Sequence, residues 1–174
     1  LIDRALRPMF PEDYHSDTQV VVSLISVDKE NMSDSLAGLA ASAALAVSDI
    51  PFNGPISEVR VARIHGELIV NPTRSALANA DIDLIIAGSA DSIVMVEGEM
   101  KEVSEAEMVA AIEVAHAAIK MQCQAQLDLA AKAGKNGPKR EYCHEPKDEE
   151  LKARVWNECY QKFYDAAKKP SEKH

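Results

Sequence analysis

The stretch VRVARIHGELIV, residues 59–70, decides the fold class of this chain. Its two halves, Val59–His65 and Glu67–Val70, are short runs rich in apolar and β-branched residues, and Gly66 separates them. A glycine between two such runs is typical of a β-hairpin, because short hairpin turns require positive φ angles. We therefore expect two antiparallel strands, the second of which ends at Asn71-Pro72-Thr73.

Two more short apolar runs follow, Ile82–Ala87 and Ser92–Glu97, and Gly98 should close the second. A long helix is then predicted over Ser104–Gly134. It begins with the S-x-x-E spacing of a capping box at Ser104 and Glu107, which satisfies two free backbone donors. Apolar residues recur after it at three- and four-residue steps, as on the buried side of a helix.

Two elements are predicted before the hairpin. Gln19–Val27 is short and rich in β-branched residues, which favours a buried strand. Leu36–Val47 is rich in alanine and favours a helix, with Ser33 or Ser35 as its N-cap. The expected order is strand, helix, four strands and long helix. This order predicts an α+β domain in which helices pack on a mainly antiparallel sheet.

The 174 residues carry a net charge of −9, which is unevenly distributed. Residues 1–134 carry −11, whereas residues 135–174 carry +2. The composition changes at the turn-forming run Ala133–Pro138, so we place a domain boundary after Gly134. An acidic balance argues against a protein that coats nucleic acid, because such proteins have an excess of basic residues.

The tail from Pro146 onward is predicted to be a second helix. Six residues share its apolar side: Leu151, Val155, Trp156, Cys159, Phe163 and Ala166. Such a helix is too small to form a domain, so its apolar side should dock elsewhere in this chain, in a missing part or on another subunit. No apolar run is long enough for a transmembrane helix, so no membrane association is expected.

The chain begins at Leu1, and LIDRALRP has the character of a helix interior, so we expect N-terminal residues to be missing. The three cysteines, Cys123, Cys143 and Cys159, are widely spaced and are expected to be reduced thiols of a cytosolic protein. Cys143 and His144 are adjacent, but no second ligand pair stands at zinc spacing, and the pair is given no role.

Arg4 and Arg7 are three residues apart on a helical segment and should share one face. Paired guanidinium groups suit phosphate, although a surface ion pair is the alternative interpretation. Asp81 and Asp83 flank one residue at a strand start, so alternation predicts both carboxylates on the same side, where they would suit a divalent cation. The alternative interpretation is that Asp81 and Asp83 are a charged pair at the start of the strand that is simply exposed to solvent.

Several strings resemble the bacterial polynucleotide phosphorylase family: LIDRALRPMFP at residues 1–11, IPFNGPI at 50–56 and DLIIAG at 83–88. The resemblance covers residues 1–134. It implies an RNase-PH-like fold, also described as ribosomal S5 domain 2-like, with 1–134 as the larger, C-terminal part of the first core domain. Residues 135–174 would be a loop and the start of the family's helical linker domain.

The resemblance also implies an activity for the parent protein. Family members are homotrimers that degrade single-stranded RNA from the 3′ end with inorganic phosphate, release nucleoside diphosphates and require Mg²⁺. We expect a cytoplasmic enzyme of mRNA turnover, with degradosome-type protein partners possible. Arg4 and Arg7 match arginines that lie near the RNA path in the family, and Ala5 replaces the family's usual proline.

The chain departs from the family's catalytic second core at two places. Asp83 matches an active-site aspartate of a D-x-K pattern, but Ile85 stands where the lysine should be. The serine-rich phosphate loop corresponds to residues 31–36, where Asp34 would repel phosphate. We therefore expect no catalytic residue here and place the Mg²⁺ site outside this chain. The alternatives are a purely structural or RNA-guiding module and a stand-alone RNase PH-type processor of tRNA ends.

Overall fold

The computed structural model describes residues 1–144 and 147–168. Residues 1–142 form one compact unit, and a second unit begins at Cys143. The first unit therefore extends past the predicted boundary at Gly134. Its elements are α1 (Ile2–Leu6), a 3₁₀ turn η1 (Arg7–Met9), α2 (Asp34–Val47), β1 (Ser57–Ile64), β2 (Glu67–Val70), α3 (Arg74–Leu77), β3 (Ala80–Gly88), β4 (Ile93–Met100) and α4 (Glu105–Lys132).

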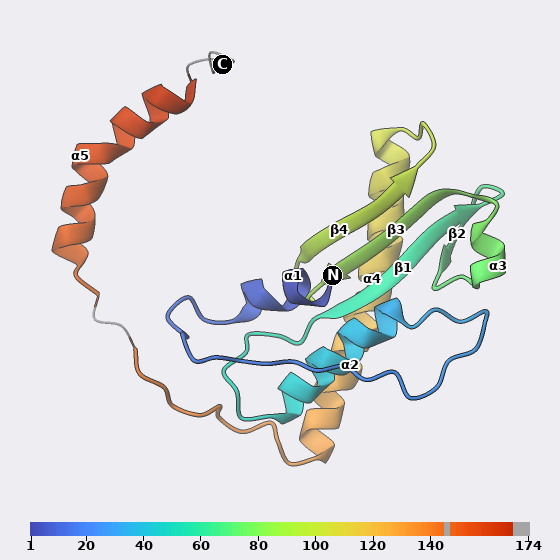
Figure 1. Cartoon of the computed structure of the whole chain (residues 1–174), viewed down its shortest axis with the longest axis horizontal. Helices are drawn as coiled ribbons and strands as arrows, with labels where there is room; N and C mark the ends of the chain where they lie inside the picture. Colours follow the sequence, from blue (N-terminus) through green and yellow to red (C-terminus); the bar gives the residue numbers. More distant parts are fainter. Residues whose placement is uncertain (145–146, 169–174) are drawn as a thin grey trace. The chain divides into compact units, whose positions relative to one another are not determined.

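The four strands form one antiparallel sheet in the order β2-β1-β3-β4 (Figure 1). The hairpin predicted from residues 59–70 is confirmed, with Ile64 opposite Glu67. His65 and Gly66 form its two-residue turn with φ angles of 52° and 85°. Positive φ at both turn residues matches the right-handed twist of the strands, which explains the tight connection.

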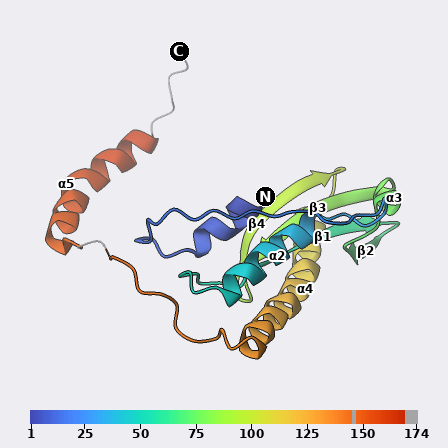
Figure 2. The same ribbon diagram turned by 60° about the horizontal axis from the view of Figure 1, so that its bottom comes forward.

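Helices cover both faces of the sheet (Figure 2). Alternate residues of β1 and β3, such as Val61 and Leu84, pack against Ala115 and Ile119 of α4. The opposite side chains, such as Ile85, pack with Leu45 of α2 and with α1. The α+β prediction is confirmed, and helix α4 begins at the predicted capping box, with both reciprocal hydrogen bonds between Ser104 and Glu107 formed.

The predicted strand at Gln19–Val27 is wrong. Within the described residues, this segment belongs to no strand of the sheet, and its side chains are exposed, Val21 to 74% and Ile25 to 97%. A β-branched run becomes a buried strand only where a neighbouring strand and a covering layer exist. Here α1 and α2 flank the segment, but no strand of the described chain pairs with it.

Two smaller expectations also change. Ser33 is the N-cap residue of α2, but its side chain makes no capping hydrogen bond; instead the Asp34 carboxylate accepts from the Ser35 N–H. Gly98 lies inside β4 rather than closing it. A Cβ at this position would lie 2.0 Å from the Asp83 carbonyl oxygen, so glycine permits the close approach of β4 to β3.

The second unit contains helix α5 (Glu149–Lys168), which confirms the predicted helix in the tail. The predicted start at Pro146 lies outside the described residues. All the large side chains of its apolar side are at least partly exposed, and Phe163 is 73% exposed.

Candidate functional site

Arg4 and Arg7 project from the first turns of the chain, where α1 ends at Leu6 and η1, which contains Pro8, begins at Arg7. Both guanidinium groups are exposed and each contacts one carboxylate: Arg4 pairs with Glu97 of β4, and Arg7 pairs with Asp3. Exposed pairs of this kind contribute little to stability because water screens them. Both arginines therefore remain accessible to an anionic ligand that displaces the carboxylate.

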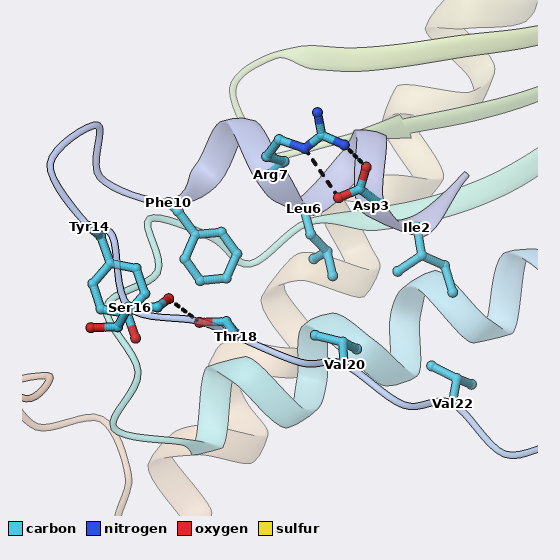
Figure 3. A pocket seen from close by; sticks show the side chains of 10 residues that line it. All are labelled: Ile2, Asp3, Leu6, Arg7, Phe10, Tyr14, Ser16, Thr18, Val20 and Val22. Atoms are coloured by element: carbon cyan, nitrogen blue, oxygen red, sulfur yellow. Dashed lines mark hydrogen bonds and ion pairs between the residues drawn. The ribbon is translucent and has the colours of Figure 1, made fainter.

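A hollow of about 600 Å³ lies beside these residues, between α1, η1 and the extended segment (Figure 3). Leu6 points into it toward Val20 and Phe10 toward Thr18, while the Arg7 guanidinium lies beside Asp3. The Phe10 and Tyr14 rings stack with centroids 5.9 Å apart. The floor is thus apolar and aromatic, and Arg7 supplies the nearest positive charge.

Arg60 forms a half-buried ion cluster on one face of the sheet, with its side chain 16% exposed. Its guanidinium donates to Asp83 of β3 at 2.5 Å and to Asp34 of α2 at 2.6 Å. Burial alone would raise the pKa of Asp34, but hydrogen bonds from Arg60 and the Ser35 N–H outweigh it and lower that pKa. The cluster ties the start of α2 to β1 and β3.

Arg63 lies on the opposite face of β1, as alternation predicts. It donates two hydrogen bonds to Asp81, both at 2.8 Å, and also contacts Glu107 of α4. The pKa of Glu107 falls to about 2, chiefly through the hydrogen bond from the Ser104 N–H and then through Arg63. This second cluster fixes the start of α4 over the sheet.

The two clusters overturn the expectation that Asp81 and Asp83 share one side. Arg63 is paired with Ile82 and Ile64 with Ala80, so Asp81 is the extra residue of a β-bulge. A bulge interrupts the alternation of side chains. Asp81 therefore joins Arg63 on the α4 face, while Asp83 joins Arg60 on the α2 face. The two carboxylates do not converge on one cation.

Glu58 is a charged residue that sequence reasoning overlooked. It is 1% exposed on β1, and neither carboxylate oxygen has a hydrogen-bond partner in the described residues. It lies under Gly38 of α2, where an added Cβ would come 2.3 Å from its Oε2. Burial raises its pKa to about 7, and Asp34 adds to the shift. The available signal was the position of Glu58, directly before the strand predicted from Val59.

A second overlooked feature fixes the segment after α4. Lys139 Nζ donates to the carbonyl oxygens of Leu45, Ala46 and Ser48, at the C-terminus of α2. Arg140 pairs with Asp49. A cation at a helix C-terminus satisfies free carbonyls and complements the helix dipole. These contacts explain why the compact unit continues past Gly134. The contacting residues are more than 90 positions apart in the sequence, so no local sequence pattern could predict them.

Within the described residues, no group of three or more His, Cys, Asp or Glu side chains is arranged to hold a metal ion. The three thiols are free: Cys123 is buried, Cys143 is exposed, and Cys159 is intermediate. None of the described helices is long and apolar enough to cross a bilayer.

Comparison with known proteins places the chain in a family. The profile of the 3′ exoribonuclease family, domain 1, matches residues 1–51, and that of domain 2 matches residues 54–118. The chain belongs to the 3′ exoribonuclease family. It is 60% identical over all 174 residues to polyribonucleotide nucleotidyltransferases of Parabacteroides distasonis and Porphyromonas gingivalis, and 59% identical over 167 residues to that of Bacteroides fragilis. It spans 23% of the length of each relative.

Proposed function

We propose that this chain is part of a phosphate-dependent 3′→5′ exoribonuclease that degrades RNA to nucleoside diphosphates. The support is its family and its 60% identity, along the whole chain, to proteins named polyribonucleotide nucleotidyltransferase. Single-stranded RNA as substrate, a homotrimeric ring, degradosome-type partners and a cytoplasmic location belong to this proposal for the longer protein. The role we assign to this part of the longer protein is RNA guiding and assembly rather than bond cleavage.

The observation that carries this role is the Asp34–Arg60–Asp83 cluster. Phosphoryl transfer is catalysed mainly by positioned cations that offset charge on the phosphoryl oxygens. Here Asp34 and Asp83 already neutralise Arg60, the nearest cation to Asp83 in the sheet. Ile85, two residues beyond Asp83, is 7% exposed in the core and cannot bind phosphate. The Mg²⁺ and inorganic phosphate that the reaction requires would therefore bind in another part of the longer protein.

The test is to incubate this chain with oligo(A), inorganic phosphate and Mg²⁺ and to measure ADP release. We expect none above the background of a sample without protein. Sustained ADP release that Asp83→Ala abolishes would overturn the proposal, because it would place the cleavage site within this chain.

Arg4 and Arg7 are the proposed RNA contacts of this chain. Because each already pairs with a carboxylate, a purely structural role is the second candidate. The double substitution Arg4→Glu/Arg7→Glu, made in a full-length enzyme carrying this sequence, distinguishes an RNA-guiding role from a structural one. Guiding arginines would lower RNA affinity and turnover while the trimer mass is kept; structural arginines would change only the mass in light scattering. Lys120→Glu/Lys132→Glu, on exposed positions of α4, is the matched control.

A further inference from the structure

Glu58 and Arg60 both leave polar atoms unused in the layer between β1 and α2. The two residues lie on the α2 face of β1, because side chains two apart on a strand point the same way. Within the described residues, both carboxylate oxygens of Glu58 and the Nε of Arg60 are buried without a hydrogen-bond partner. Protein interiors rarely leave a buried donor and a buried acceptor unsatisfied, because each unmade hydrogen bond is costly.

Helix α2 covers these two residues with matching spacing. Its first residue, Asp34, pairs with Arg60. Gly38, one turn later, lies over Glu58, and its missing side chain leaves room for the carboxyl group. Four residues of a helix advance ~6 Å and two residues of a strand ~6.6 Å, so the contacts form two successive rungs. An arginine side chain is long enough to pass from one rung to the next.

The guanidinium group of Arg60 is only partly used. Its Nη1 donates to Asp83 at 2.5 Å, and its Nη2 donates to Asp34 at 2.6 Å. Nε and Nη2 form one edge of the planar group, and such an edge suits a carboxylate that accepts two parallel hydrogen bonds. Asp34 takes only the Nη2 end of this edge. The Nε end therefore remains available to a second carboxylate.

Four charged groups act on Glu58 from the elements around it. Asp34 of α2 repels its carboxylate, whereas Arg60 of β1, Arg4 of α1 and the amino group of Leu1 attract it. The Arg4 side chain is 55% exposed and already belongs to an ion pair, and Leu1 is 41% exposed, so water screens both charges. Arg60 is the cation that shares the buried layer with Glu58.

We propose that ionised Glu58 takes the Nε–Nη2 edge of Arg60 from Asp34, so that one buried proton controls how the first turn of α2 is held to the sheet. Protonated Glu58 is neutral, and Asp34 then keeps Arg60. Release of the proton to solvent leaves a buried negative charge, which is costly unless it is paired, and the unused Nε is the donor at hand. Asp34 retains its hydrogen bond from the Ser35 N–H but loses its tie to β1.

The experiment follows the isotope-labelled 174-residue chain by NMR from pH 5 to pH 9. The Glu58 carboxyl carbon should titrate near pH 7, and the Arg60 Nε–H signal should move with the same midpoint. The amide of Ala37, which closes the first turn of α2, should lose protection from hydrogen exchange about threefold or more between pH 6 and pH 8, since one linked proton allows up to about tenfold per pH unit. Arg63 is the internal control, because its Nε already donates to Asp81 and its signal should not move.

Two substitutions separate the partners. Glu58→Gln fixes the neutral state, so Arg60 should stay with Asp34 and its Nε–H signal should become independent of pH. Asp34→Asn keeps the side-chain shape but removes both the competitor and a charge that repels Glu58, so Glu58 should titrate at a lower pH than in the wild-type chain. Asp91→Asn, at an exposed position of the β3–β4 turn, is the matched control and should leave the Glu58 midpoint unchanged.

Three results would overturn the inference. The first is a Glu58 carboxyl that titrates while the Arg60 Nε–H signal stays constant, which would mean that water or the Leu1 amino group stabilises the charge. The second is an Arg60 signal that moves equally in Glu58→Gln, which would assign the response to another group. The third is a Glu58 carboxyl that does not titrate between pH 5 and pH 9, which would leave no switch in this range.

Discussion

Replacing Glu58 by glutamine should remove a pH dependence from the stability of this unit. The carboxyl group is 1% exposed, and neither oxygen accepts a hydrogen bond in the described residues. Burial raises its pKa from 4.5 to about 7. Asp34 pushes in the same direction, while the Leu1 amino group, Arg4 and Arg60 act against it. Glutamine has nearly the same shape and cannot ionise.

The sign follows from proton linkage. The folded state binds the proton more tightly than the unfolded state, so this group favours folding in acid. That contribution is lost as pH rises from about 4.5 toward about 7. At ~1.36 kcal/mol for each pKa unit, the wild-type chain should lose about 2.5 kcal/mol of stability relative to Glu58→Gln between pH 5 and pH 8.

The assay is urea denaturation of both chains at several pH values between 5 and 8, followed by far-ultraviolet circular dichroism. The matched control is Glu67→Gln on β2, which makes the same chemical change at an exposed site. The difference between wild type and Glu58→Gln should grow with pH, whereas the control difference should stay flat. A constant difference for Glu58→Gln would refute the reasoning, because it would mean that the buried carboxyl is paired and ionised.

Three further substitutions test individual contacts, each by urea denaturation. Gly98→Ala should destabilise the unit by about 2 kcal/mol or more, because the new Cβ would meet the Asp83 carbonyl oxygen; an unchanged midpoint would contradict the close approach of β4 to β3. Ser104→Ala should cost about 1 kcal/mol by removing the capping box of α4, and Ser26→Ala, at an exposed position of the extended segment, is the comparison. Lys139→Met should cost about 1–2 kcal/mol, since three carbonyls of α2 lose their donor, and loss of protection of α2 amides in hydrogen exchange would locate the effect.

Local patterns predicted most of the fold, because the elements they describe are stabilised by neighbours in sequence. The hairpin at Gly66 depends on turn chemistry, and α4 depends on the Ser104–Glu107 box and a regular apolar spacing. Helix α5 also follows from its own periodicity. Each of these signals lies within the element that it predicts.

Predictions failed where distant residues determine the outcome. The run at 19–27 has strand character, but strand formation requires a partner strand. Asp81 and Asp83 lie on opposite faces because a bulge, set by the pairing of β1 with β3, interrupts the alternation. Alternation along β1 accounts for Arg60 and Arg63 on opposite faces, but their acidic partners on α2, β3 and α4 lie at long sequence separations. The carbonyl groups that Lys139 contacts at the end of α2 also lie more than 90 residues away in the sequence.

The most direct test of the account is the phosphorolysis rate of a full-length enzyme carrying this sequence with Asp83→Asn. This change removes one charge of the Arg60 cluster and keeps the side-chain shape. If the cleavage site lies outside the part of the enzyme formed by this chain, phosphate-dependent ADP release from oligo(A) should stay within about twofold of wild type. A loss of about a hundredfold or more in kcat, with the oligomeric mass and the RNA affinity unchanged, would contradict the account and place Asp83 in the catalytic machinery.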